Sequence, residues 1–130
     1  MNHRARRLRA KESTLYSEAM SDCIFCKIVA GQIPAKVVAE TELSLAFHDI
    51  APAQPLHVLV IPKSHHANIG ELSFTAPDQL VDLIQLGSKI ADQHTDGHFR
   101  FTFNTGAGAG QTVFHAHGHV MSKTPKESID

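Results

Sequence analysis

Hydrophobic positions gather in several short runs of this chain of 130 residues, and each run predicts a strand. Residues 37–40 and 43–48 are β-prone runs separated by two polar residues, which predicts a hairpin. Residues 57–61 are apolar after their first histidine, and this predicts a strand that is buried on both faces and ends at Pro62. Residues 99–103 alternate phenylalanine with polar side chains, which predicts a half-buried strand.

One long helical pattern precedes the phenylalanine strand. Thr75 is expected to cap it, with Asp78 at the third helical position and the Asp96-Gly97 pair at its end. The apolar face, which would pack on the sheet, consists of Leu80, Leu83, Ile84, Gly87, Ile90 and Ala91. We therefore predict an α+β fold with a single antiparallel sheet of about five strands and one main helix, without internal repeats or a second domain.

Three histidines near the carboxyl end, His115, His117 and His119, are separated by single small residues. Residues 112–114 favour a strand, and side chains two positions apart on a strand share one face at a spacing of about 7 Å. We therefore expect three imidazoles on one face. Three apolar side chains on that face would bury more apolar surface than three imidazoles do. A row of polar rings at these positions therefore indicates a functional role.

The segment Asn104–Thr112 contains three alternating glycines and precedes this histidine strand. Such a loop can turn backbone N–H groups toward an anion, with the side chains of Gln111 and Thr112 as further donors. A dinucleotide-binding fingerprint would open a helix, so a Rossmann interpretation does not fit. A flexible hairpin connection is the alternative, but the adjacent histidines favour an anion site.

Charge divides the chain into a leader, a domain and a tail. Residues 1–20 carry five basic and two acidic side chains, which leaves seven basic and eleven acidic ones in residues 21–130. A domain of that sign is a poor general binder of nucleic acid. We expect a disordered leader at 1–20, a catalytic domain at 21–122 and a polar tail at 123–130.

The leader lacks the apolar core of a secretory signal. It could be a transit peptide or a nucleic-acid arm, but we favour an upstream start ahead of Met20. No apolar run approaches the ~20 residues of a membrane span, so we expect a soluble, cytoplasmic protein.

Cys23 and Cys26 are the only cysteines and form a Cys-x-x-Cys pair. Without a secretory signal, a structural disulfide is not expected. The pair could be two buried thiols or half of a zinc site that histidines complete.

The chain resembles the histidine triad (HIT) family, whose motif is His-x-His-x-His followed by two apolar residues, as in 115–121. The similarity covers roughly residues 22–121 and is closest to the nucleoside phosphoramidase-like (Hint) branch. Segments in family order are Asp22–Ile28, Ile33–Lys36, Ala46–Ile50 and Pro55–Lys63. The chain differs from the family pattern at four places. Gly118 stands where the motif usually has an apolar residue, Thr112 where a serine is common, and Thr105 where a glutamate is common. The polar tail also differs from the ending of the animal branch.

A neutral imidazole can attack phosphorus near pH 7 and give an N-phosphoryl intermediate. His117, at the centre of the row, has neighbours to hold it, and the resemblance likewise implies that it is the nucleophile. We expect His119 to donate to a phosphate oxygen or the leaving group, and His115 to orient the row or bind metal. Gln111, Thr112 and the loop amides would stabilise the phosphate charge.

The resemblance also implies the substrate contacts. Asp49 would bind the ribose, while Ile24, Phe25, Phe47 and Ile50 would form the base pocket, although each of the four could be ordinary core. The full expected set is Ile24, Phe25, Phe47, Asp49, Ile50, Asn104, Gly110, Gln111, Thr112, Val113, His117 and His119. A structural zinc, not required for catalysis, would be held by Cys23, Cys26, His57 and His115. His65, His66, His94 and His98 are expected to be solvated.

The predicted function is hydrolysis of purine nucleoside phosphoramidates or adenylyl conjugates through a nucleotidyl-histidine. Cleavage of dinucleoside polyphosphates is a variant of it. Two alternatives are a zinc hydrolase that uses the triad as ligands, and a nucleotide-binding scaffold with little turnover. The expected partners are a purine nucleotide and a second copy of the chain in a homodimer, with no membrane and no specific nucleic acid.

Overall fold

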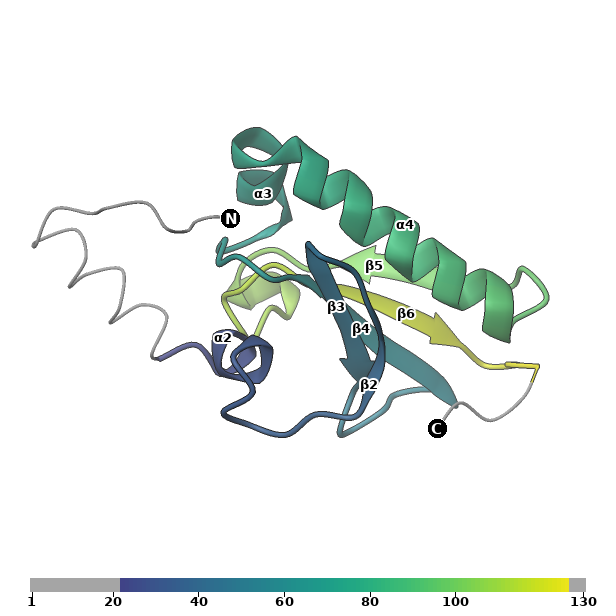
Figure 1. Ribbon diagram of the computed structural model, residues 1–130. Coiled ribbons are helices and arrows are strands. Elements are labelled where there is room, and N and C mark those ends of the chain that lie inside the picture. Colours follow the sequence, from purple (N-terminus) through teal and green to yellow (C-terminus); the bar gives the residue numbers. More distant parts are fainter. Residues whose placement is uncertain (1–21, 127–130) are drawn as a thin grey trace, which may run out of the picture.

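The computed structural model describes residues 22–126 and shows one five-stranded antiparallel sheet with helices (Figure 1). The α+β prediction is thereby confirmed. In spatial order the strands are β2 (Val37–Glu40), β3 (Ser44–His48), β4 (Leu56–Pro62), β6 (Gly118–Ser122) and β5 (Arg100–Phe103). The helices are α2 (Ile24–Val29), α3 (Ile69–Thr75) and α4 (Pro77–His94), with a short 3-10 turn at Ala107–Ala109. The expectations for the leader at 1–20 and for tail residues 127–130 lie outside the described residues.

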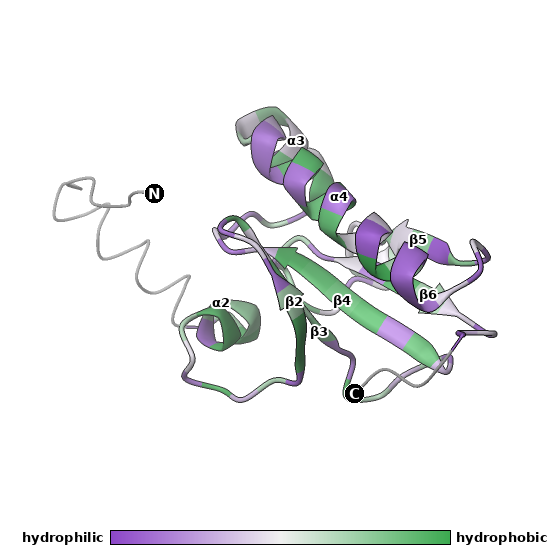
Figure 2. Ribbon diagram, turned by 45° about the vertical axis from the view of Figure 1, so that its right-hand side comes forward, coloured by the Kyte–Doolittle hydropathy of each residue, from purple (hydrophilic) through white to green (hydrophobic). Residues whose placement is uncertain are grey.

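Strand β4 lies at the centre of the sheet, and all seven of its residues are buried. Figure 2 shows it as an almost continuously apolar strand. Val58 and Val60 point to the face covered by α4, where they pack with Leu83 and Ile90. The alternate residues Leu59 and Ile61 point to the other face and pack with Phe25 of α2 and Phe47 of β3. The two-sided burial predicted from the sequence therefore reflects a helix on each face.

Gly118, the departure from the family motif, lies against two phenylalanine rings of β5. A Cβ atom there would approach Phe101 to 2.4 Å and Phe103 to 2.6 Å. Gly87 of α4 also leaves space for the Phe101 ring, because a Cβ atom added at Gly87 would lie 2.4 Å from that ring. The two glycines let the Phe101 ring lie between α4 and β6.

The predicted cap of the long helix at Thr75 is wrong, because Ala76 is the capping residue and the helix begins one residue later than expected. Thr75 is the last residue of α3, and α4 begins at Pro77 with no side-chain cap. The missed helix α3 has a capping pair of its own. The Asn68 side chain accepts from the Glu71 N–H at 2.9 Å, and the Glu71 carboxylate accepts from the Ala67 N–H at 2.6 Å.

No helix in residues 22–126 is both long and apolar enough to cross a bilayer.

The expected histidine strand is only half formed. β6 begins at Gly118, so His119 lies in the sheet whereas His115 and His117 precede it. The reason is that the Ala116 N–H donates to the His66 carbonyl at 2.6 Å rather than to a sheet strand. The three imidazoles therefore do not form one flat row: His115 turns toward the cysteines, and the rings of His117 and His119 stay neighbours at 5.0 Å.

Candidate active site

The central histidine of the motif is held by the backbone of the first. His117 Nδ1 lies 2.8 Å from the carbonyl oxygen of His115, and since a carbonyl only accepts, Nδ1 carries the proton. In the neutral ring the other nitrogen, Nε2, therefore has a free lone pair. The edge of Phe25 contacts the His117 ring, with the centroids 5.1 Å apart, and limits its rotation. The local bend at His115 thus presents a fixed, unprotonated nitrogen.

The third histidine belongs to a chain of hydrogen bonds that fixes its tautomer too. The Ala53 N–H donates to His57 Nδ1 at 2.9 Å, so neutral His57 carries its proton on Nε2. That Nε2–H lies 3.0 Å from His119 Nδ1 and 3.4 Å from a carboxylate oxygen of Asp49. His119 Nδ1 accepts, and its own proton is consequently on Nε2. The site offers one imidazole acceptor, on His117, beside one imidazole donor, on His119.

Burial keeps the imidazoles of His117 and His119 neutral. It lowers the pKa of His119 to about 4, with further lowering from His117 and His57 and an opposing effect of the Asp49 carboxylate. Burial also lowers the pKa of His117, against the His115 carbonyl and Asp49, which both favour the charged ring. At neutral pH His117 is therefore a free base, and His119 is a neutral hydrogen-bond donor.

The glycine loop is braced from within by Gln111. The Gln111 side chain accepts from the Gly106 N–H at 2.8 Å and donates to the carbonyls of Ala67 and Val113 at 2.8 and 3.0 Å. Both amide hydrogens are used, so the expectation that this side chain donates to phosphate is wrong. Gly106 and Gly110 have positive φ angles of 89° and 96°, which only glycine adopts readily. Thr112 is exposed beside this braced loop.

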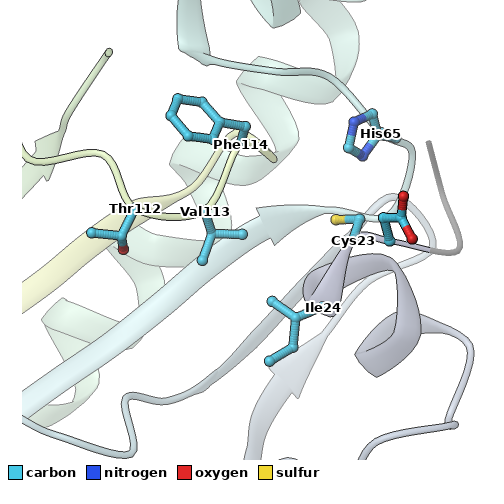
Figure 3. A pocket seen from close by; sticks show the side chains of 7 residues that line it. Cys23, Ile24, His65, Thr112, Val113 and Phe114 are labelled. Atoms are coloured by element: carbon cyan, nitrogen blue, oxygen red, sulfur yellow. The ribbon is translucent and has the colours of Figure 1, made fainter. Parts of the chain in front are cut away.

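Some of the remaining expected substrate residues line two hollows, and the others lie outside both. Phe25 and Phe47 are buried and meet edge to face at 5.6 Å, so they form a core wall. Figure 3 shows Ile24, Thr112, Val113 and Phe114 around a pocket of about 390 Å³. Asp49 and the fully exposed Ile50 line another, of about 400 Å³, with His57. Asn104 is half-buried and lies close to Gly110.

The cysteine pair meets two histidines beside the first hollow. Cys23 Sγ and Cys26 Sγ lie 3.3 and 3.5 Å from His115 Nδ1, and Cys26 Sγ lies 3.3 Å from His65 Nδ1. These four donor atoms lie within 4.8 Å of one another. His115 Nε2–H donates to the Pro62 carbonyl at 2.9 Å, which leaves Nδ1 free to bind a metal. Two thiolates and two imidazoles are a typical zinc set, and this cluster fits that ion.

The fourth member of this cluster is His65, whereas His57 was expected there. Antiparallel pairing sets Val60 opposite Gly118, and His57 opposite Met121 at the far end of β6. The chain that continues past Pro62 instead runs alongside the residues before Gly118, which brings His65 to His115 with ring centroids 5.1 Å apart. The expected solvation of His65 is therefore also wrong. Strand register, had it been known, would have found this residue.

A second group, Asp49 with His57 and His119, also gathers possible ligand atoms. A metal here would need the lone pair of His57 Nε2. The Ala53 N–H donates to Nδ1 of that ring, so the ring proton is on Nε2 and no lone pair is available there. Binding would break that bond or remove a proton from a neutral imidazole. The geometry favours a hydrogen-bonded chain over a metal centre.

The sequence profile of the HIT domain matches residues 30–126. The chain belongs to the HIT family. Adenosine 5'-monophosphoramidase hnt1 of Schizosaccharomyces pombe is 44% identical over 105 residues, which cover 81% of this chain and 77% of that protein. A HIT family hydrolase from Clostridium thermocellum is 39% identical, with a TM-score of 0.73 over 78% of this chain and 90% of that one.

A zinc-bound histidine triad family protein from Mycobacterium smegmatis is 33% identical to this chain. Its TM-score is 0.71, and the alignment covers 85% of this chain and 81% of that protein. The resemblance to the histidine triad family is thereby confirmed, and its hydrolases support a hydrolytic, nucleotide-binding role for this HIT protein.

Proposed function

We propose that this HIT protein hydrolyses purine nucleoside phosphoramidates or adenylyl conjugates through a nucleotidyl-histidine on His117. The observation that supports this most is the bond from His117 Nδ1–H to the His115 carbonyl, because it leaves Nε2 unprotonated beside the N–H of His119. The similarity to a yeast adenosine monophosphoramidase supports the same substrate class.

In the first step, His117 Nε2 attacks phosphorus, a new N–P bond forms, and the bond from phosphorus to the leaving amine breaks. The amine takes a proton from water. The positive charge of the phosphorylated imidazole is stabilised by the His115 carbonyl on Nδ1. In the second step water attacks the same phosphorus, returns a proton to solvent, and frees the nucleotide and His117.

The neighbouring groups stabilise charge rather than exchange protons. With its pKa lowered to about 4, His119 donates a hydrogen bond from Nε2 to a phosphate oxygen or the departing nitrogen. His57 and Asp49 hold that ring. Loop amides and the Thr112 hydroxyl are the other expected phosphate donors, and Asp49 lines the hollow that would take the ribose.

A zinc ion would be held by Cys23, Cys26, His65 and His115. When bound, it would supply a cross-link between α2, the segment after β4 and the start of the motif, with no part in the chemistry. This differs from a zinc hydrolase, whose metal would need an open position at the reacting phosphorus.

The substrate class is tested with a panel of adenosine and guanosine phosphoramidates, acyl adenylates and dinucleoside polyphosphates. We expect the highest kcat/KM on a purine phosphoramidate or an adenylate. Preference for dinucleoside polyphosphates would replace the proposed class. Tight nucleotide binding without turnover on any member would support the scaffold alternative.

We also propose that two copies associate about a twofold axis. Val81 and Ile84 are exposed apolar residues on α4, Phe74 of α3 is 90% exposed, and β5 is an edge strand of the sheet. An edge strand with apolar neighbours favours pairing with a second copy.

A further inference from the structure

We propose that Cys23 and Cys26 are a site of reversible thiol oxidation whose disulfide misplaces the nucleophile His117. The two sulfurs lie within 4.8 Å of each other, three residues apart on one turn. Cys23 also lines the 390 Å³ pocket, and Figure 3 shows its sulfur beside His65, opposite Val113 and Phe114. A small oxidant in that pocket can reach it.

Reduced thiols and the disulfide differ in what they offer His115. The Pro62 carbonyl fixes the His115 proton on Nε2, so Nδ1 needs a donor or a metal. In the metal-free reduced state the Cys23 thiol lies 3.3 Å away and can donate. The Cys26 sulfur likewise lies 3.3 Å from His65 Nδ1, so as a thiol it can donate to that ring.

A disulfide has no S–H and binds zinc poorly. It would leave His115 Nδ1 buried with neither a donor nor a metal, a situation that folded proteins avoid. The joined cysteines are the cap of α2 and a residue in its first turn, so their bond does not tie α2 to His65 or His115. We expect His115 to turn away from its present position. Its carbonyl oxygen is the acceptor that holds His117, so the nucleophile moves with it.

The oxidation balances with hydrogen peroxide as the oxidant. The Cys23 sulfur attacks one peroxide oxygen, the O–O bond breaks, and that oxygen stays on Cys23 as a sulfenic acid while the other oxygen leaves as water with the thiol proton. The Cys26 sulfur then attacks Cys23, the S–O bond breaks, and a second water leaves as the S–S bond forms. Two thiols lose two electrons and their two protons, and the peroxide gains them.

The test uses the full chain, purified without a histidine tag, in zinc-loaded, reduced metal-free and peroxide-treated states. Intact mass reports the disulfide, a chromogenic chelator reports zinc release, and NMR reports the ring signals of His115 and His117. We expect disulfide formation, zinc release and shifted ring signals. The rate on an adenosine phosphoramidate should fall about a hundredfold, the cost of a misplacement near 1 Å, and recover with dithiothreitol.

The matched control is Cys23→Ser, whose hydroxyl can still donate to His115 but cannot form the disulfide. Treated and untreated samples of this variant should have equal rates and equal spectra. The inference is overturned if no disulfide forms, or if it forms with unchanged His117 signals. It is equally overturned if peroxide slows Cys23→Ser as much as the unaltered chain. Only the rate measurement depends on the proposed function. If the untreated protein does not hydrolyse the phosphoramidate, the proposed function fails, and the mass, zinc and NMR results still test the oxidation.

Discussion

Single residues set the protonation of the site, and this determines how its rate depends on pH. In the proposed mechanism His117 attacks as the neutral ring, and burial lowers its pKa below the ordinary value near 6.5. As pH falls, activity is lost only when that lowered pKa is reached. We therefore expect the midpoint of the acid limb of kcat/KM on a phosphoramidate to lie below about 6.5. An acid limb centred at or above the ordinary histidine pKa would contradict the assigned protonation.

Residue types and spacing predict His117 as the nucleophile, because the centre of the motif has a neighbour on each side, and this assignment stays a prediction. They could not predict that a backbone carbonyl holds His117, since this depends on the bend before β6. Gln111 was assigned to phosphate because its chemistry allows it, but its partners Ala67 and Val113 appear only when the loop is folded. His65 was missed because strand register, not sequence distance, brings it to the cysteines.

Among the elements, β5 follows from two-residue periodicity, β4 from a continuous apolar run, and the β2–β3 hairpin from two β-prone runs around a short polar pair. Helices α2 and α3 are six and seven residues long, too short for a 3.6-residue period to become visible. Helix α2 begins with a sulfur as its cap, because Cys23 Sγ accepts from the Cys26 N–H at 3.3 Å. Short helices of this kind are defined by caps and packing rather than by pattern.

The packing of α4 on β6 depends on the absence of a side chain at Gly118. In Gly118→Ala the new methyl group would overlap the Phe101 and Phe103 rings, and we expect a loss of about 1–3 kcal/mol in the free energy of unfolding. Gly108→Ala is the matched control, because no atom lies within 4 Å of its added Cβ. Its stability should change by no more than about 0.5 kcal/mol. Equal denaturation midpoints for the two variants would refute the role given to Gly118.

At the scale of the whole molecule, the zinc-type cluster joins three segments that are distant in sequence. Chelation under reducing conditions should lower the thermal midpoint, because a ligand that binds only the folded state stabilises it. Hydrolysis at lower temperature should continue, since the reduced thiols still contact His115 and His65. Zinc content, melting and rate are measured on the same sample. Prompt loss of turnover would instead indicate a catalytic metal.

The proposed dimer is a further property of the whole molecule. Light scattering at micromolar concentration should give twice the chain mass. Val81→Lys with Ile84→Lys, at exposed positions on α4, should shift the protein toward monomers with its fold intact. A monomer mass for the unaltered chain would reject the assembly.

The central claim is a covalent bond between His117 Nε2 and the phosphorus of a nucleotide. Rapid acid-free quenching of the enzyme with an adenosine phosphoramidate, followed by intact mass and peptide mapping, tests it most directly. The account predicts one adenylyl group per chain, located on His117, that forms and decays at rates compatible with turnover, and no adduct in His117→Ala. An adduct on His119, or full turnover by His117→Ala, would contradict it.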